Sequence, residues 1–104
     1  MNDTITPAEL ARLLGADNHV KVLDVRRRDD RVEVEHPIPG AEWRDPERIA
    51  EWAGELQRDA EVIVYCVHGL SVGKGARDYL RGQGMQARSL EGGIEAWQAF
   101  SKGS

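Results

Sequence analysis

The sequence predicts an α/β fold, a single domain whose central, mostly parallel sheet of about five strands carries helices on both faces. An apolar run without alternation over residues 62–65 is typical of a strand buried on both sides, and residues 20–25 predict a second buried strand. Along the chain these runs alternate with stretches in which apolar residues recur at helical spacing. A chain of 104 residues holds one hydrophobic core, so we expect one domain over residues 1–104, with its core at about 5–100.

The first predicted helix begins at residues 6–9, whose Thr-Pro-Ala-Glu sequence has the form of a capping box. Thr6 is the expected N-cap, Pro7 takes the first helical position, and Glu9 reaches back to the cap. Leucines follow at helical spacing, and Gly15 predicts the end of the helix.

Asp24 and Arg26 lie at the carboxyl end of the strand predicted over residues 20–25. Open α/β sheets gather functional groups at this edge, so both side chains are candidates for a supporting role at a site. Residues 26–31 are dense in charges of both signs, which predicts a solvated turn or short helix rather than a binding patch.

The middle of the chain is predicted to contain a loop and a helix. Residues 37–41 are too rich in proline for the interior of an element and predict an ordered crossing loop. A helix is expected over residues 44–58, with an apolar stripe that includes Trp52.

The last third of the chain is predicted to contain helix, strand and helix. A helix runs to Gly82, a short strand covers residues 85–90, and residues 91–93 form a tight turn into a closing helix. We expect Trp97 of that helix to be largely buried and residues 101–104 to be frayed.

Cys66, the only cysteine of the chain, directly follows the apolar run of residues 62–65. A short loop separates it from the next predicted helix, so the thiol is expected to face a helix N-terminus. Free N–H groups and the helix dipole favour an anion there, and a thiolate is an anion. A lone cysteine is more often a small buried hydrophobe, but this position favours a reactive nucleophile.

The composition excludes several classes of function. With 18 acidic and 14 basic residues the net charge is −4, which gives no general attraction to nucleic acid. One cysteine cannot form an internal disulfide. No apolar stretch approaches the roughly 20 residues of a membrane span, and the N-terminus lacks the pattern of a signal peptide. We therefore expect a cytoplasmic protein that binds neither membrane nor nucleic acid.

Four motifs, in order along the chain, together resemble the rhodanese family of single-domain sulfurtransferases. Residues 23–26 (Leu-Asp-Val-Arg) look like the first-strand signature of that family, and residues 38–41 (Ile-Pro-Gly-Ala) look like its proline loop. Residues 64–66 with Gly69 are similar to its active-site strand and loop, and residues 90–97 resemble its closing motif. The resemblance spans residues 5–100, which implies a rhodanese-like domain.

The resemblance implies a sulfurtransferase in which Cys66 takes a sulfane sulfur from a donor such as thiosulfate and becomes a persulfide. The sulfur then passes to a thiophilic acceptor, which is cyanide or a thiol, with a protein acceptor as an alternative. Neither a metal nor an organic cofactor is required. The loop expected to bind the substrate consists of Val67, His68, Gly69, Leu70, Ser71 and Val72.

This loop departs from the family pattern in one respect. Many members carry an arginine five residues after the cysteine and a serine or threonine next, whereas this chain has Ser71 and Val72. His68 and Lys74 are the nearby residues that can supply positive charge, and Lys74 is expected on the helix rather than in the loop. His68 is predicted either to contact substrate or to be a solvent-exposed loop residue.

Three other functions compete with sulfur transfer. A related phosphatase would need a longer loop and an arginine to hold phosphate, and the sequence has neither. A catalytically weak module, acting as persulfide carrier, thiol sensor or partner-binding domain, fits the missing arginine. A metal site is disfavoured because Cys66, His68, His19 and His36 lack the spacing of metal ligands.

Overall fold

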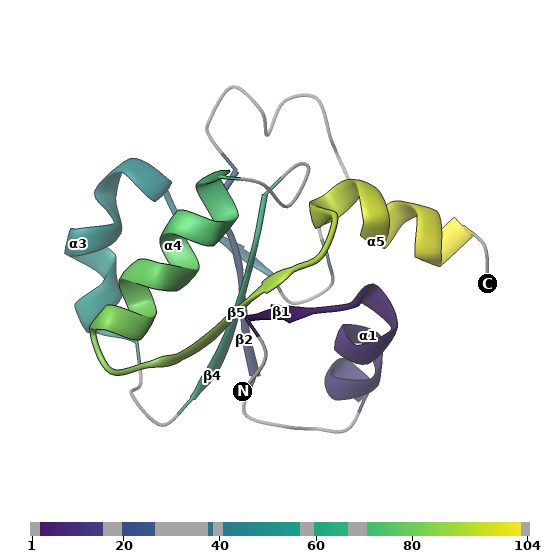
Figure 1. Cartoon of the computed structure of the whole chain (residues 1–104), viewed down its shortest axis with the longest axis horizontal. Coiled ribbons are helices and arrows are strands. Elements are labelled where there is room, and N and C mark those ends of the chain that lie inside the picture. The colour runs from purple at the N-terminus through teal and green to yellow at the C-terminus, as the bar shows by residue number, and fades with distance from the viewer. Residues whose placement is uncertain are drawn as a thin grey trace.

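The computed structural model describes residues 3–15, 20–26, 38, 41–56, 60–66 and 71–102, with the backbone alone for Ser71 and Lys102. Figure 1 shows a sheet with helices on either side. The elements are β1 (Thr4–Ile5), α1 (Pro7–Gly15), β2 (Val20–Asp24), β3 (Glu42–Trp43), the 3-10 helix η1 (Pro46–Arg48), α3 (Ile49–Trp52), the 3-10 helix η2 (Ala53–Glu55), β4 (Glu61–Tyr65), α4 (Ser71–Gly82), β5 (Gln86–Leu90) and α5 (Gly93–Lys102).

The sheet has five strands in the order β1-β5-β4-β2-β3, and all neighbouring strands are parallel. This confirms the predicted α/β fold. β4 lies at the centre, and its last four residues are buried, as its unbroken apolar sequence requires. β1 and β3 were not predicted, because each has only two residues and neither shows an apolar run.

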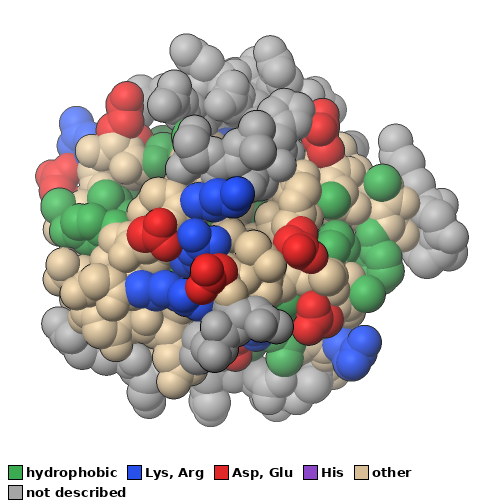
Figure 2. Space-filling model, viewed as in Figure 1, with side chains coloured by type: hydrophobic (Ala, Val, Ile, Leu, Met, Phe, Trp, Pro, Cys, Tyr) green, Lys and Arg blue, Asp and Glu red, His purple; other side chains and the backbone are tan. Residues whose placement is uncertain are grey.

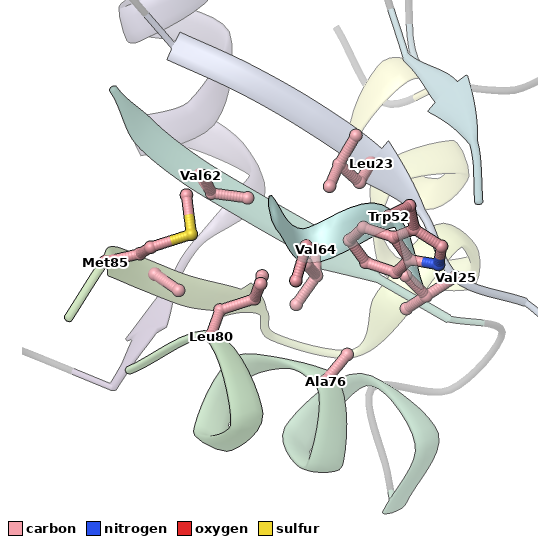
Figure 3. Packing of buried hydrophobic residues seen from close by; sticks show 10 residues of the cluster. Leu23, Val25, Trp52, Val62, Val64, Ala76, Leu80 and Met85 are labelled. Carbon is pink, nitrogen blue, oxygen red and sulfur yellow. The ribbon is translucent and has the colours of Figure 1, made fainter. Parts of the chain in front are cut away.

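Helices cover both faces of the sheet, as expected. α3 and α4 pack on one face and α1 and α5 on the other (Figure 1). Figure 3 shows the core on the face covered by α3 and α4, where Leu80 of α4 and Trp52 of α3 meet Val62 and Val64 of β4. Each face of β4 is therefore sealed from water.

The capping box at the start of α1 is confirmed. The Glu9 N–H donates to Thr6 Oγ1 (3.2 Å), and the Thr6 N–H and hydroxyl both donate to Glu9 Oε1 (3.2 and 2.9 Å). These hydrogen bonds, the one from the Thr6 backbone first, lower the pKa of Glu9 from its ordinary value. Leu10 is fully buried, and the helix ends at Gly15 as predicted.

The helix predicted over residues 44–58 is shorter than expected, since η1, α3 and η2 cover only residues 46–55. The Asp45 side chain accepts a hydrogen bond from the Glu47 N–H (3.0 Å) and so caps the start of η1. The Arg44 N–H donates to the Asp24 carbonyl (2.9 Å) and therefore belongs to the sheet edge. Gly54 weakens the last turn, and Leu56 has extended backbone. Residues 57–58 lie outside the described residues.

The closing helix α5 differs from expectation in two respects. Trp97 is half-buried rather than largely buried, because its ring lies at the margin of the core and contacts the exposed Phe100, with ring centroids 5.9 Å apart. Helical backbone also continues through Ser101 to Lys102, where the sequence predicted fraying.

Two arginines tie α4 to the edge of the sheet. Arg77 Nη1 donates to Ser89 Oγ (3.1 Å) and to the Asp3 carbonyl (3.2 Å). Arg81 Nε donates to the Ala87 carbonyl (2.7 Å), and its guanidinium pairs with the Asp3 carboxylate. Figure 2 shows Lys and Arg side chains beside Asp and Glu side chains on the face where α4 and β5 lie. These contacts fix the orientation of α4 over the sheet.

Candidate functional site

Cys66 lies directly after β4, and its side chain is buried, with 6% of the residue exposed. The carbonyl before it, of Tyr65, accepts a hydrogen bond from the Val25 N–H (2.9 Å). The Cys66 carbonyl accepts one from the Ile94 N–H (2.8 Å) at the start of α5. The backbone that carries the thiol is therefore held by the segments on both sides of β4.

The first turn of α4 lies against the thiol. A Cβ atom built on Gly73 would be 3.3 Å from Cys66 Sγ, which is closer than ordinary van der Waals contact. The first turn of a helix carries free N–H groups and the positive end of the dipole, so the sulfur lies where an anion is favoured. The predicted juxtaposition of Cys66 with this helix N-terminus is thus present.

The turn before α5 places the Ile94 N–H at the Cys66 carbonyl. The Glu91 N–H donates to the Ile5 carbonyl (2.9 Å), which continues the pairing of β1 with β5. Gly92 and Gly93 then take φ values of 74° and 63°, a region that favours glycine. This confirms the tight turn expected at residues 91–93.

Asp24 and Arg26 form a buried ion pair at the carboxyl end of β2. Arg26 Nη2 lies 2.6 Å from Asp24 Oδ2, and Arg26 Nε donates to both carboxylate oxygens at 3.0 Å. The Arg26 N–H also donates to Asp24 Oδ1 (2.9 Å). Arg26 is only 3% exposed, so its assignment to a solvated turn was wrong, because the carboxylate two residues earlier neutralises it inside the protein. Residues 27–31 lie outside the described residues.

Aromatic side chains surround this ion pair. The Trp43 Nε1–H donates to the Arg26 carbonyl (2.8 Å), and the Arg26 guanidinium carbon lies 6.0 Å from the centroid of the Tyr65 ring. Burial, together with the charge of Asp24, raises the pKa of Tyr65 well above its ordinary value of 10.0. The ion pair therefore braces the ends of β2, β3 and β4, next to the strand end that carries Cys66.

The structure brings together only part of the site predicted from sequence. Cys66, Asp24 and Arg26 lie at neighbouring strand ends, since the register pairs Asp24 with Tyr65. Ser71 begins α4, and Val72 is half-buried in its first turn. Val67, His68, Gly69 and Leu70 lie outside the described residues, so their predicted role is untested.

Sequence reasoning missed two residues that shape the site, Gly73 and Ile94. A signal for Gly73 was present, because glycine inside a helix is unfavourable and often marks close approach of another group. The hydrogen bond of Ile94 had no sequence signal, since any residue except proline supplies the same N–H.

The described part of the chain has neither a cluster of metal ligands nor a helix able to span a membrane. Within the described residues, no group of three or more His, Cys, Asp or Glu side chains is placed to hold a metal ion. In the same part of the chain, every helix is too short or too polar to cross a membrane.

Comparison with known proteins adds independent information. The family model described as Rhodanese-like domain matches residues 6–100. A protein named thiosulfate sulfurtransferase GlpE from Pseudoalteromonas translucida is 40% identical over 63 residues, which cover 60% of this chain and 59% of that one. A protein of the same name from Pseudomonas putida is 34% identical over 94 residues, covering 89% and 83%. The crystal structure of a rhodanese-related protein from Thermoplasma volcanium superimposes with a TM-score of 0.80 at 26% identity, covering 95% of this chain and 93% of that one.

Proposed function

The chain belongs to the family of rhodanese-like domains, and on that premise we propose that it is a sulfurtransferase acting through a persulfide on Cys66. The donor is a sulfane-sulfur compound such as thiosulfate, and the acceptor is thiophilic, either cyanide or a thiol. The relatives in Pseudoalteromonas translucida and Pseudomonas putida carry the name thiosulfate sulfurtransferase, which supports this choice of donor.

The proposed reaction has two steps. The Cys66 thiolate attacks the outer sulfur of thiosulfate, the S–S bond of the donor breaks, and sulfite leaves with the electron pair. The acceptor then attacks the outer sulfur of the persulfide, the new S–S bond breaks, and the Cys66 thiolate returns. No electron is gained or lost by the protein over the cycle.

The position of Cys66 under the first turn of α4 is the observation that carries this proposal. The attacking thiolate and the persulfide are both anions, and the N-terminal turn of a helix favours negative charge. The hydrogen bond from the Ile94 N–H to the Cys66 carbonyl holds the strand end in place while the thiol changes partner.

Asp24 and Arg26 have a supporting role in this proposal. Because the Arg26 guanidinium is bound to the Asp24 carboxylate at 2.6–3.0 Å, the pair stabilises the strand ends rather than holding an anionic donor. We assign donor binding instead to the N-terminus of α4 and to the backbone N–H groups of the predicted loop, with His68 as a further candidate.

We propose the cytoplasm as the compartment of this reaction. A catalytic thiol has to stay reduced between turnovers, so we assign the domain of residues 1–104 to the reducing cytoplasm. A small thiol, or a protein thiol, is the acceptor available there.

Intact-mass spectrometry tests this function directly. After incubation with thiosulfate and removal of excess reagent, the protein should gain the mass of one sulfur atom, and a reductant should reverse the gain. Cys66→Ser should gain nothing and should keep the fold, because a hydroxyl has nearly the same size as a thiol but cannot store sulfur. Sulfur gain by the Cys66→Ser variant would contradict the mechanism.

A weaker alternative is favoured by one feature of the sequence, the serine at position 71 where many family members have arginine. In that case the domain is a persulfide carrier, a thiol sensor or a partner-binding domain rather than an enzyme that turns over thiosulfate. Persulfide formation without release to cyanide would identify a carrier, and reversible oxidation of Cys66 by peroxide without persulfide formation would identify a thiol sensor.

A further inference from the structure

We propose that Gly73 is a positioning residue for the Cys66 sulfur, an inference that rests on the proposed function for its catalytic meaning. Its missing side chain lets the first turn of α4 approach Sγ and leaves the thiol in the orientation from which it attacks. We assign this role to Gly73 and not to Gly75 of the same helix, because a Cβ on Gly75 would have no atom within 4 Å.

The tight contact is with the sulfur alone. A Cβ on Gly73 would lie 3.3 Å from Cys66 Sγ, but 3.7 Å from the Cys66 nitrogen and 3.8 Å from its Cβ, which are ordinary distances. The methyl group of an alanine at position 73 would therefore displace the sulfur by a few tenths of an ångström and leave the rest of Cys66 unaffected.

Neither backbone is free to move instead. Cys66 is held by the Ile94 hydrogen bond of 2.8 Å and follows the central strand. α4 is anchored to the sheet edge by the hydrogen bonds of Arg77 and Arg81. The strain of an added methyl group is therefore relieved mainly by a small rotation of the Cys66 side chain, which moves the sulfur by a few tenths of an ångström from its place in the parent protein.

The chain provides a matched control in the same helix. Gly73 is buried and Gly75 is exposed, and Gly75→Ala makes the same chemical change in open space. Both substitutions replace glycine by the best helix former, so neither is expected to weaken α4 itself.

The test measures the reaction of Cys66 with methyl methanethiosulfonate. The thiolate attacks the methylthio sulfur, the S–S bond of the reagent breaks, methanesulfinate leaves, and Cys66 becomes a methyl disulfide. Because the chain has one cysteine, intact mass reports this site alone. We expect Gly73→Ala to slow the reaction about tenfold, since a misplacement of about 1 Å can cost about 100-fold and this one is a few tenths of an ångström. Gly75→Ala should stay within about twofold of the parent protein. Equal rates for the two variants would overturn the proposal.

A double-mutant cycle on thermal stability distinguishes strain at the sulfur contact from a general effect of the substitution on folding. Gly73→Ala should lower the thermal midpoint when Cys66 is present, and it should not lower the midpoint in a Cys66→Ala background, where Sγ is gone. If Gly73→Ala alone fails to fold while the double variant folds, the sulfur contact is established in the same way. An equal loss in both backgrounds would refute it.

Thiosulfate turnover then distinguishes the two proposals. Gly73→Ala should lower kcat with little change in KM, because it moves the nucleophile rather than the groups that hold the donor. The parent protein could take no sulfur from thiosulfate while Gly73→Ala still slows disulfide formation relative to Gly75→Ala. That result would refute the proposed function and leave the role of Gly73 in place.

Discussion

The backbone N–H of Ile94 donates a 2.8 Å hydrogen bond to the carbonyl of Cys66. This bond joins the last helix of the chain to the central strand, at the residue that carries the thiol. It depends on the turn at Gly92 and Gly93, which brings α5 back over the carboxyl end of β4.

Gly92→Ala should therefore destabilise the protein. The residue has a φ of 74°, and its Cβ would lie 2.5 Å from Ala96 Cβ, so the turn must open. We expect a loss of about 1–3 kcal/mol in the free energy of unfolding, measured by urea denaturation. Gly54→Ala is the control, because it adds a methyl group in open space. Equal denaturation midpoints for the two variants would show that the turn tolerates a side chain.

Breaking the ion pair of Asp24 and Arg26 should be costly. Asp24→Asn or Arg26→Gln leaves one charge buried without its partner, and each change should cost about 3–5 kcal/mol. In the double variant no unpaired charge remains, so its cost should be clearly less than the sum of the two single costs. Additive costs in denaturant unfolding would mean that the two side chains act independently.

Tyr65 should make stability fall at high pH. Burial and the charge of Asp24 raise the pKa of Tyr65 in the folded protein above the 10.0 of the unfolded chain, so the unfolded chain loses this proton first. The contribution is complete below pH 10 and declines as the pH rises above it. Denaturant unfolding at neutral pH and near pH 11 should show this loss.

Tyr65→Phe should remove that part of the decline, since phenylalanine has no proton to lose. Among the described residues the Tyr65 hydroxyl makes no hydrogen bond of good geometry, although Asp24 and the Ile38 backbone interact with it, so the variant should cost at most about 1–2 kcal/mol at neutral pH. Tyr79→Phe, on the half-buried flank of α4, is the control and should keep the decline. A parent protein whose stability is constant across this range would contradict the prediction.

The two tryptophans should differ in their contribution to stability. Trp52 is 5% exposed, and its Nε1–H donates to the Asp45 carbonyl (2.8 Å), so Trp52→Ala should cost about 3–5 kcal/mol. Trp97 is half-buried, and Trp97→Ala should cost less, about 1–3 kcal/mol. Thermal or chemical denaturation would rank the two variants. A larger loss of unfolding free energy for Trp97→Ala would mean that the face covered by α5 contributes more to stability than the face covered by α3.

Ser71→Arg should improve the use of thiosulfate. Position 71 begins α4, and many family members have arginine there, so a guanidinium would add a charge-assisted hydrogen bond to the anionic donor. We expect KM for thiosulfate to fall about tenfold, which corresponds to about 1.4 kcal/mol, and the gain to shrink as salt rises.

Ser71→Gln has similar reach without the charge and should change KM little. If the arginine and glutamine variants behave alike, or if arginine raises KM, the loop serves an uncharged or protein-borne sulfur donor instead.

Local sequence patterns predicted the parts of the fold that depend on near neighbours. The capping box at Thr6 and Glu9 and the glycine turn at Gly92 and Gly93 formed as expected, because their hydrogen bonds and backbone angles lie within a few residues. The unbroken apolar run of β4 indicated a strand buried on both faces, and it lies at the centre of the sheet. The position of Cys66 at the carboxyl end of this strand therefore marked it as the candidate nucleophile.

Patterns of composition failed where packing between elements decided the outcome. Arg26 belongs to a charged segment, yet it is buried, because β2 and β4 enclose it with Asp24 and the Tyr65 ring. The two-residue strands β1 and β3 exist only because longer strands offer them an edge to pair with. Trp97 lies at the margin of the core because the position of α5 is set by its neighbours.

The amino-acid sequence was sufficient to predict an α/β domain with a thiol at the end of a central strand. These features follow from periodicity, capping and the order of apolar runs, all of which are local. The arrangement of helices and strands in space was needed to show that Gly73 lies against the sulfur, that Ile94 holds the Cys66 carbonyl and that the ion pair of Asp24 and Arg26 is buried beside Tyr65. That arrangement depends on how strands pair and helices dock on the sheet, which is fixed by packing among residues far apart in the chain.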